Sequence, residues 1–248
     1  MRAMNVKRLL VLLVAISCVG VHASVLHDRA RAGDVDFFTS GQEGLDERES
    51  GSGQTPLMAA CLAGQAEVVD KLLRLGANPS IPEKDGYTPP HGVAFQGREQ
   101  AALALVKHGI NVDEKHKDGY TPLHRTVWGR TPRHMATAKV LVQEGGAKVD
   151  ALDAGGSLPS HKALESSWHE MLELLLELGA SPNVPGRNGD TLLHLAVKKR
   201  DERAITAIVK SGGDPAVKNS EGLSPLDMAT KISEEYAAML TAPGKEEL

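Results

Sequence analysis

Four histidines recur along the chain at a regular interval and are the first candidates for chemistry. His91, His124, His161 and His194 are separated by 33, 37 and 33 residues. Histidine is a common metal ligand and general base near neutral pH. However, residues at matching positions of neighbouring packed helices lie about 10 Å apart, which is too far to share one metal ion. The spacing therefore predicts a structural role and no metal site.

The remaining candidates for catalysis or metal binding lack the partners that such chemistry needs. His134 and His169 could approach one another, but no cysteine or carboxylate constellation accompanies them. Cys61 occupies a small-residue position, where a buried thiol behaves as a small hydrophobic group. The sequence contains no phosphate-binding loop, helical metal-ligand pair or nucleophile elbow. We therefore expect no catalytic residue, no metal and no cofactor, and the protein is predicted not to be an enzyme.

The histidines belong to a longer repeat that is marked by glycines. The glycines that open similar phrases are Gly53, Gly86, Gly119, Gly156, Gly189 and Gly222, at intervals of 33, 33, 37, 33 and 33 residues. Such a period indicates stacked structural repeats. After three of these glycines a threonine and a proline, as in Thr55-Pro56, can cap and begin a helix. Apolar residues at i, i+1, i+4 and i+5, as in 68–73, then predict a second helix, which another glycine ends.

The phrases after these glycines resemble the ankyrin repeat, whose hallmark is T-P-L-H-x-A. The matching segments are Thr55-Pro56-Leu57-Met58, Thr88-Pro89-Pro90-His91, Thr121-Pro122-Leu123-His124 and Thr191-Leu192-Leu193-His194. The resemblance implies an all-α solenoid of stacked helix-turn-helix units with short hairpin loops, in which the histidines bridge backbone groups of adjacent hairpins. One helix pair buries too little apolar surface to be stable alone, so the units are expected to stack around a continuous core.

The period also predicts the domain organisation. Residues 24–52 are expected to hold a degenerate first repeat and a loop, residues 222–242 a capping repeat, and residues 243–248 an exposed tail. The five recognisable repeats within 53–221 are 53–85, 86–118, 119–155, 156–188 and 189–221. The 37-residue interval places three extra residues near Arg130 to Arg133 and one at Gly145-Gly146, which predicts an enlarged turn between two helices. Leu158 replaces a capping threonine, so we expect a frayed helix after it.

Residues 1–23 are predicted to be a signal peptide and not part of the fold. Arg2, Lys7 and Arg8 give a basic start, which an uncharged and mostly aliphatic run from Leu9 to Gly20 follows. Val21-His22-Ala23 then fits a signal-peptidase site. The alternative is an uncleaved membrane anchor, but a run of twelve residues is short of the roughly 20 that a membrane span needs. After cleavage we expect no membrane span.

The last four residues, Lys245 to Leu248, resemble the K-D-E-L class of retention signals with one change. Together with a signal peptide, this tail predicts residence in the lumen of the endoplasmic reticulum, within the secretory pathway. The alternative is an exported bacterial or pathogen protein that is secreted or periplasmic, or that acts on host proteins, in which case the tail is a coincidence.

Charge and cysteine content narrow the kind of partner. The chain has 28 basic and 32 acidic residues, and loss of the three basic residues of the signal peptide would change its net charge from −4 to −7. Such a chain is not expected to bind nucleic acid. Cys18 would leave with the signal peptide, so Cys61 alone cannot form an internal disulfide. We expect a monomer that binds a protein.

The ankyrin resemblance implies a concave surface, built from hairpin tips and first helices, whose variable positions select the partner. In two adjacent units, two of these positions hold four of the chain's eight aromatic residues. The predicted partner-binding residues are Leu62, Tyr87, Phe95, Tyr120, Trp128, Arg125, Arg130 and Arg133. Exposed aromatics are typical of a binding hot spot, and the arginines favour a partner segment that is apolar with some negative charge. The alternative is that Phe95 and Trp128 pack inward between the units.

Overall fold

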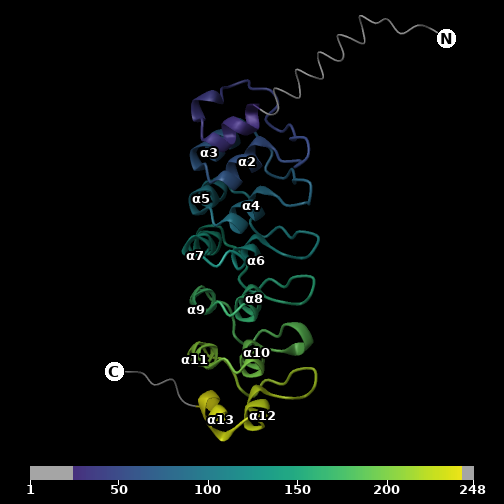
Figure 1. Ribbon diagram of the computed structural model, residues 1–248, viewed down its shortest axis with the longest axis vertical. Helices are drawn as coiled ribbons and strands as arrows, with labels where there is room; N and C mark the ends of the chain where they lie inside the picture. Colours follow the sequence, from purple (N-terminus) through teal and green to yellow (C-terminus); the bar gives the residue numbers. More distant parts are fainter. Residues whose placement is uncertain (1–24, 242–248) are drawn as a thin grey trace, which may run out of the picture.

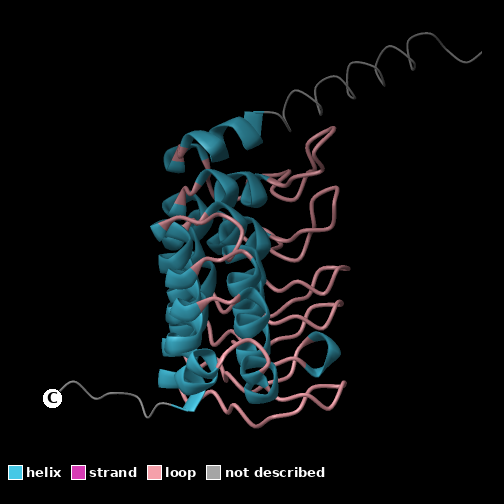
Figure 2. Cartoon of the chain, turned by 60° about the horizontal axis from the view of Figure 1, so that its bottom comes forward, coloured by secondary structure: helices cyan, strands magenta, loops and turns pink. Residues whose placement is uncertain are grey.

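The computed structural model describes residues 25–241, which form an elongated stack of helix pairs (Figure 1). Two columns of helices run along the stack, and a row of loops projects from one side of it (Figure 2). The described residues contain no β-strand, so the predicted all-α solenoid is confirmed. None of the helices between residues 25 and 241 is long and apolar enough to cross a membrane. The predicted signal peptide and the tail at 243–248 lie outside the described residues.

Each unit contributes a first helix, which lies next to the loops, and a second helix in the other column. The first helices are α2 (Pro56–Ala63), α4 (Pro89–Gln96), α6 (Pro122–Thr126), α8 (Pro159–Glu165), α10 (Leu192–Lys199) and α12 (Pro225–Thr230). The second helices are α3 (Ala66–Arg74), α5 (Glu99–Lys107), α7 (Pro132–Lys139) continued by the π-helical turn η2 (Val140–Glu144), α9 (His169–Glu177), α11 (Glu202–Lys210) and α13 (Glu234–Thr241). Residues 25–32 are also helical, and short 3-10 turns occur at η1 (Val35–Phe37) and η3 (Arg187–Gly189).

The first helices begin where a capping residue precedes the first turn. In α2, the Thr55 hydroxyl accepts a hydrogen bond from the Met58 backbone N–H at 3.2 Å. Pro56 occupies the first helical position, where no backbone donor is needed. Gly64 then ends the helix at φ 85°, in the left-handed region that favours glycine. Residues close in the sequence therefore determine both ends of this helix.

The core runs along the stack because most helices pack against their counterparts in the next unit. Buried apolar side chains form one large cluster that includes Leu26 and Leu105, and a second that includes Leu123 and Leu240. A small cluster around Leu141 lies between them. The partly buried Val106 contacts the small cluster and the first large one, and the partly buried Val142 contacts the small cluster and the second. The core is therefore continuous but thin in its middle.

The enlarged turn expected in the 37-residue unit is present. α6 ends at Thr126 and α7 begins at Pro132, so residues 127–131 form the connection, whereas only Gly97 and Arg98 separate α4 from α5. The single extra residue was expected at Gly145-Gly146. The structure instead widens the helix just before this point into the π-helical turn η2, which is how a helix absorbs an inserted residue.

The prediction of a frayed helix after Leu158 is wrong. α8 is a regular helix over Pro159–Glu165, although Leu158 offers no capping hydroxyl. Leu158 is fully buried in the structure. Burial of a leucine side chain contributes about 2 kcal/mol, which offsets the loss of a cap worth about 1 kcal/mol. Packing therefore compensates for the missing local signal.

Candidate partner-binding site

The recurring histidines join neighbouring units through hydrogen bonds. At His124, Nδ1 accepts from the Thr121 backbone N–H at 3.2 Å and contacts the Thr121 hydroxyl at 2.9 Å. Because Nδ1 is an acceptor, Nε2 carries the proton and donates to the Ser157 carbonyl of the next unit at 3.1 Å. Burial lowers the pKa of His124 to about 4, so the ring is neutral near pH 7. The predicted bridging role is confirmed.

The same bridge recurs along the stack, and one example was missed in the sequence. The further Nε2 contacts to a carbonyl of the next unit are His91 to Tyr120, His161 to Asp190, and His194 to Leu223, at 3.1, 3.2 and 3.0 Å. His27 makes an equivalent contact to the Gln54 carbonyl at 2.7 Å. No T-P-L-H phrase surrounds His27. It lies 26 residues before Gly53, whereas His91 lies 28 before Gly119, so the repeat spacing did not reveal this role.

The other residues considered for catalysis or metal binding also have structural roles. His134 bonds through Nε2 to the Phe95 carbonyl of the preceding unit at 2.9 Å, whereas His169 pairs with Asp201 of the following unit at 2.7 Å. These two histidines therefore do not pair with one another. Cys61 is fully buried, and burial raises the pKa of its thiol. Within residues 25–241 no group of three or more histidine, cysteine or carboxylate side chains could hold a metal ion.

Two large aromatic side chains are exposed where α4 and α6 lie side by side. Phe95 is 47% exposed and Trp128 is 50% exposed. Their rings meet edge to face with centroids 6.5 Å apart, and Trp128 meets Tyr120 in the same way at 5.6 Å. The alternative that Phe95 and Trp128 pack inward is therefore wrong. Phe95, Trp128 and Tyr120 form one connected group of rings, and Tyr87 is linked to it through Arg125.

A recess of about 350 Å³ lies between α2, α4 and α6, beside the exposed rings. We call it the aromatic recess. Its apolar lining includes Met58, Leu62, Phe95 and Trp128. Tyr87 lines it from the hairpin side and stacks on His116 with ring centroids 4.0 Å apart. Of the predicted residues, Leu62, Tyr87, Phe95, Trp128 and Arg125 thus line one cavity. The lining residue Met58 was not anticipated, and neither was His116, which contacts Tyr87.

Arg125 lies beneath the aromatic rings and not on the surface. Its guanidinium carbon is 4.5 Å from the Tyr87 ring centroid and 4.7 Å from those of Tyr120 and Trp128. Its Nη2 is 2.6 Å from the Asp118 carboxylate and also donates to the Tyr87 hydroxyl. Only 4% of the residue is exposed. Arg125 was predicted to contact a partner, but its charge is neutralised internally and its role here is to hold the rings in place.

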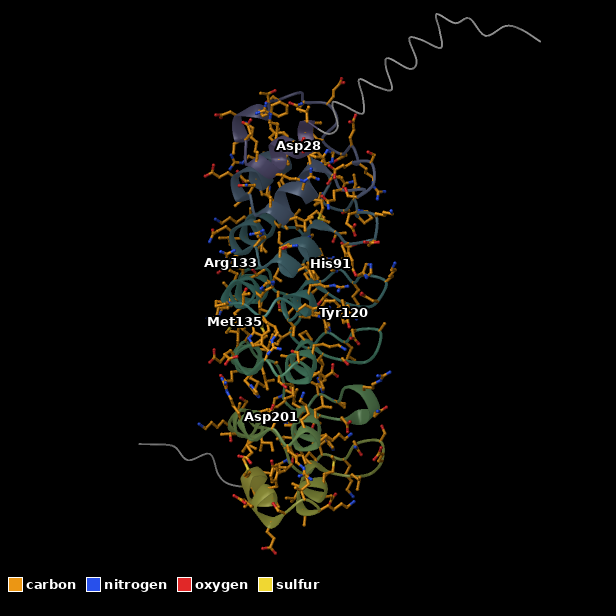
Figure 3. The ribbon with its side chains drawn as sticks, viewed as in Figure 1. Asp28, His91, Tyr120, Arg133, Met135 and Asp201 are labelled. Carbon is orange, nitrogen blue, oxygen red and sulfur yellow. The ribbon has the colours of Figure 1, made fainter. Side chains whose placement is uncertain are left out.

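The other two predicted arginines do not converge on the aromatic recess. Arg130 is exposed beside a shallower depression that Tyr120, Lys162 and Glu165 also line. Arg133 lies on α7, and Figure 3 places it with the second helices, away from His91 and Tyr120. The three arginines therefore form no positive patch over the aromatic recess. This geometry removes the basis for expecting a negatively charged partner there.

Two carboxylates for which no role was predicted border the recess instead. Glu83 and Asp85 lie in the loop that precedes α4, and both line the aromatic recess. Their position at a hairpin tip, close to Gly86, was the only signal in the sequence. The Glu83 carboxylate accepts hydrogen bonds from the backbone N–H groups of Asp85 and Tyr87, at 3.0 and 3.2 Å. The hairpin therefore holds one negative charge in place at the mouth of the recess.

Comparisons with known proteins agree with this architecture. The mouse B-cell lymphoma 3 protein homolog is 30% identical over 126 residues, which are 45% of this chain and 28% of that protein. The crystal structure of the ankyrin repeat domain of Bcl-3 superposes on this chain with a TM-score of 0.77 at 28% sequence identity. The match covers 88% of this chain and 97% of the Bcl-3 domain. The human ASB11 ankyrin repeat domain has a TM-score of 0.66 at 24% identity over 88% of this chain and 97% of its own, a likeness of fold alone.

A family model described as ankyrin repeats (3 copies) matches residues 26–116, 57–153 and 134–219. These matches span nearly all the described units, including the first one. The repeats form a scaffold for protein–protein interaction. Because the model covers well over half of the sequence and the helix pairs stack as described, the chain belongs to the ankyrin-repeat family.

Proposed function

We propose that the protein is a non-catalytic interaction module, an adaptor or regulator, that holds a partner protein against the concave surface of its stack. The observation that carries this proposal is the exposure of Phe95 and Trp128 beside the apolar lining of the aromatic recess. Large rings left half exposed in a chain so poor in aromatic residues resemble the anchors of binding hot spots. The proposal includes no cofactor, metal or nucleic acid.

A pair of matched double variants tests this function. Phe95→Ala combined with Trp128→Ala removes the exposed rings, whereas Glu165→Ala combined with Lys231→Ala changes the equivalent positions of α8 and of the turn after α12. We expect proximity labelling in native cells, followed by pull-down, to lose the partner with the first variant and to keep it with the second. Equal capture by the wild-type chain and the Phe95/Trp128 variant, each with an unchanged melting temperature, would refute the concave face as the binding site.

The place of action that we propose is the lumen of the endoplasmic reticulum. The signal-like segment at 1–23 and the tail at 245–248 support it. Deletion of Lys245 to Leu248 is expected to increase the amount of protein secreted by eukaryotic cells. If secretion is unchanged by the deletion, the alternative of an exported bacterial or pathogen protein, secreted or periplasmic, becomes the better explanation.

A further inference from the structure

The charge around the aromatic recess points to the chemistry of its partner. Glu83 and Asp85 line the recess, and neither forms an ion pair within residues 25–241. Asp85 is exposed, and no side-chain hydrogen bond of its carboxylate is present in the described structure. Arg125 also lines the recess, but Asp118 neutralises its charge. Among the residues that line the recess, the unpaired charges are therefore both negative.

Elsewhere on the inner face, carboxylates close to the first helices are paired with cations. Asp153 lies 3.4 Å from the Lys162 ammonium, and Asp190 also pairs with a lysine, Lys198. Near the N-terminal end of the stack, Arg31 lies 2.6 Å from Glu49. Glu83 and Asp85 thus differ from Glu49, Asp153 and Asp190, because neither carboxylate forms an ion pair with a cation of the described residues.

The floor of the recess is apolar. Met58 and Leu62 on α2 lie opposite Phe95 and Trp128. Gly92 allows the close approach of α2 and α4, because a Cβ at this position would lie 3.0 Å from the Met58 sulfur and 3.2 Å from a Leu62 methyl group. A volume of about 350 Å³ is at the small end of binding pockets and suits a single bulky anchor more than a folded surface.

We infer that the aromatic recess binds a partner segment that inserts one large apolar side chain between Leu62, Phe95 and Trp128 and places a lysine or arginine against Glu83 and Asp85. This inference rests on the proposed function and specifies the partner of the same site. It reverses the charge expected from the arginines in the sequence. The apolar contact supplies the affinity, and the carboxylates select the sequence of the segment and its direction.

The test is selection from a library of random 12-residue peptides displayed on phage. The purified wild-type chain is compared with Glu83→Gln/Asp85→Asn, in which the new amide at position 83 keeps the hydrogen-bond acceptor of the hairpin while both charges are lost. Glu221→Gln is the matched control, because Glu221 precedes Gly222 as Asp85 precedes Gly86. Phe95→Ala/Trp128→Ala serves as the variant without an anchor site. Circular dichroism melting curves establish that all four chains are folded.

We expect peptides selected on the wild-type chain and on Glu221→Gln to carry a lysine or arginine near a large apolar residue. This basic enrichment should disappear on Glu83→Gln/Asp85→Asn, and the Phe95/Trp128 variant should enrich no peptides. A synthetic copy of a selected peptide should bind the charge-neutral variant at least tenfold more weakly at low salt, with the difference shrinking as salt is added.

Several results would overturn the inference. These are enrichment of acidic peptides, basic enrichment that survives loss of both carboxylates, or no enrichment on the wild-type chain. Sedimentation that reveals a dimer dependent on Trp128 would make a second copy of the chain the occupant. If the native partner depends on Phe95 and Trp128 but not on the two carboxylates, the charge inference fails while the proposed function stands. If the partner is indifferent to the aromatic rings, the proposed function itself fails.

Discussion

The inner face has two regions that share one backbone plan but carry different side chains. Seven residues after each capping position, the region of α2, α4 and α6 carries Leu62, Phe95 and Trp128. The region of α8, α10 and α12 carries charged side chains at the same positions: Glu165, Lys198 and Lys231. The histidine bridges continue through both regions. Units can thus stack in the same way while some present apolar side chains and others present charged side chains to solvent.

The contrast extends to the fourth residue after the capping position. In α6 this residue is Arg125, which is buried under three rings and paired with Asp118. In α8 it is Lys162, which remains partly exposed and lies 3.4 and 3.5 Å from Asp153 and Glu165. The same ionic chemistry supports a partly exposed aromatic cluster in one region and a charged surface in the other. Residues outside the repeat motif therefore determine the character of each region.

Acid should have the largest effect, and it acts through the histidines of the aromatic region. Burial lowers the pKa of both His91 and His124 from 6.5 to about 4. The unfolded chain therefore binds more protons between these values, so the stabilisation is complete above pH 6.5 and is lost as the pH falls toward 4. We expect each histidine to lower the free energy of unfolding by about 2 kcal/mol between pH 7 and pH 5.

Urea unfolding at pH 7, 6 and 5 measures this loss. Replacement of His124 by Asn removes one titrating group, so the midpoint of the variant should vary less steeply with pH. The pKa of Asp70 is also lowered, chiefly by its hydrogen bond from His108, but its contribution is lost only below the ordinary carboxylate pKa of 3.8. A wild-type midpoint that is constant between pH 7 and pH 5 would contradict the neutral, buried state of the bridges.

Arg125→Ala should destabilise the protein far more than Lys162→Ala. Removal of the Arg125 guanidinium leaves Asp118 without its 2.6 Å partner and takes the cation from beneath three rings. Loss of a buried guanidinium that pairs with a carboxylate costs about 3 kcal/mol. Lys162 lies farther from its partner, at 3.4 Å, and Asp153 keeps hydrogen bonds from the backbone N–H groups of Gly155 and Ser157, so loss of Lys162 should cost about 1 kcal/mol. Urea denaturation of both variants compares them. Similar midpoints would mean that the two regions do not differ in the way described.

Thr121→Val should have a smaller effect. The substitution keeps the shape of the side chain but removes the hydroxyl that lies 2.9 Å from His124 Nδ1. We expect a loss of about 1 kcal/mol, the usual cost of one capping or side-chain hydrogen bond. Thr206→Val, on the exposed face of α11, is the control and should change stability by less than about 0.5 kcal/mol. If the two variants unfold at the same urea concentration, the hydroxyl does not support the bridge.

Glu165→Trp is expected to have the smallest effect and tests whether an exposed ring is sufficient for binding. The substitution places an indole in α8 at the position that corresponds to Trp128. The site is exposed, so stability should change by less than about 0.5 kcal/mol. The depression beside α8 is lined by Arg130 and Lys162, and its lining has no carboxylate once Glu165 is replaced, so the variant should select no additional basic peptides from the library. New basic peptides on this variant would mean that exposure of a ring alone is enough.

The fold could be predicted largely from local patterns. The segment Thr121-Pro122-Leu123-His124 encodes a helix start and a bridge to the next unit within four residues. The same local pattern failed at Leu158, where the missing threonine predicted a frayed helix. α8 is regular because burial of Leu158 stabilises it. The site was predictable only in part. The positions of Phe95 and Trp128 follow from the repeat, but nothing local indicates that Arg125 turns inward.

The sequence by itself determined the repeat, its helix ends and the positions that face the loops. These features depend on capping, chain stiffness and apolar periodicity, which act over a few residues. Only the tertiary structure decided the sign of charge at the aromatic recess. Arg125 contacts Tyr87 from the preceding unit and pairs with Asp118 from its own hairpin, so its charge is neutralised within the protein. Glu83 and Asp85, which also line the recess, have no such ion pair among the described residues. Such neutralisation depends on distances between units, which no local pattern encodes.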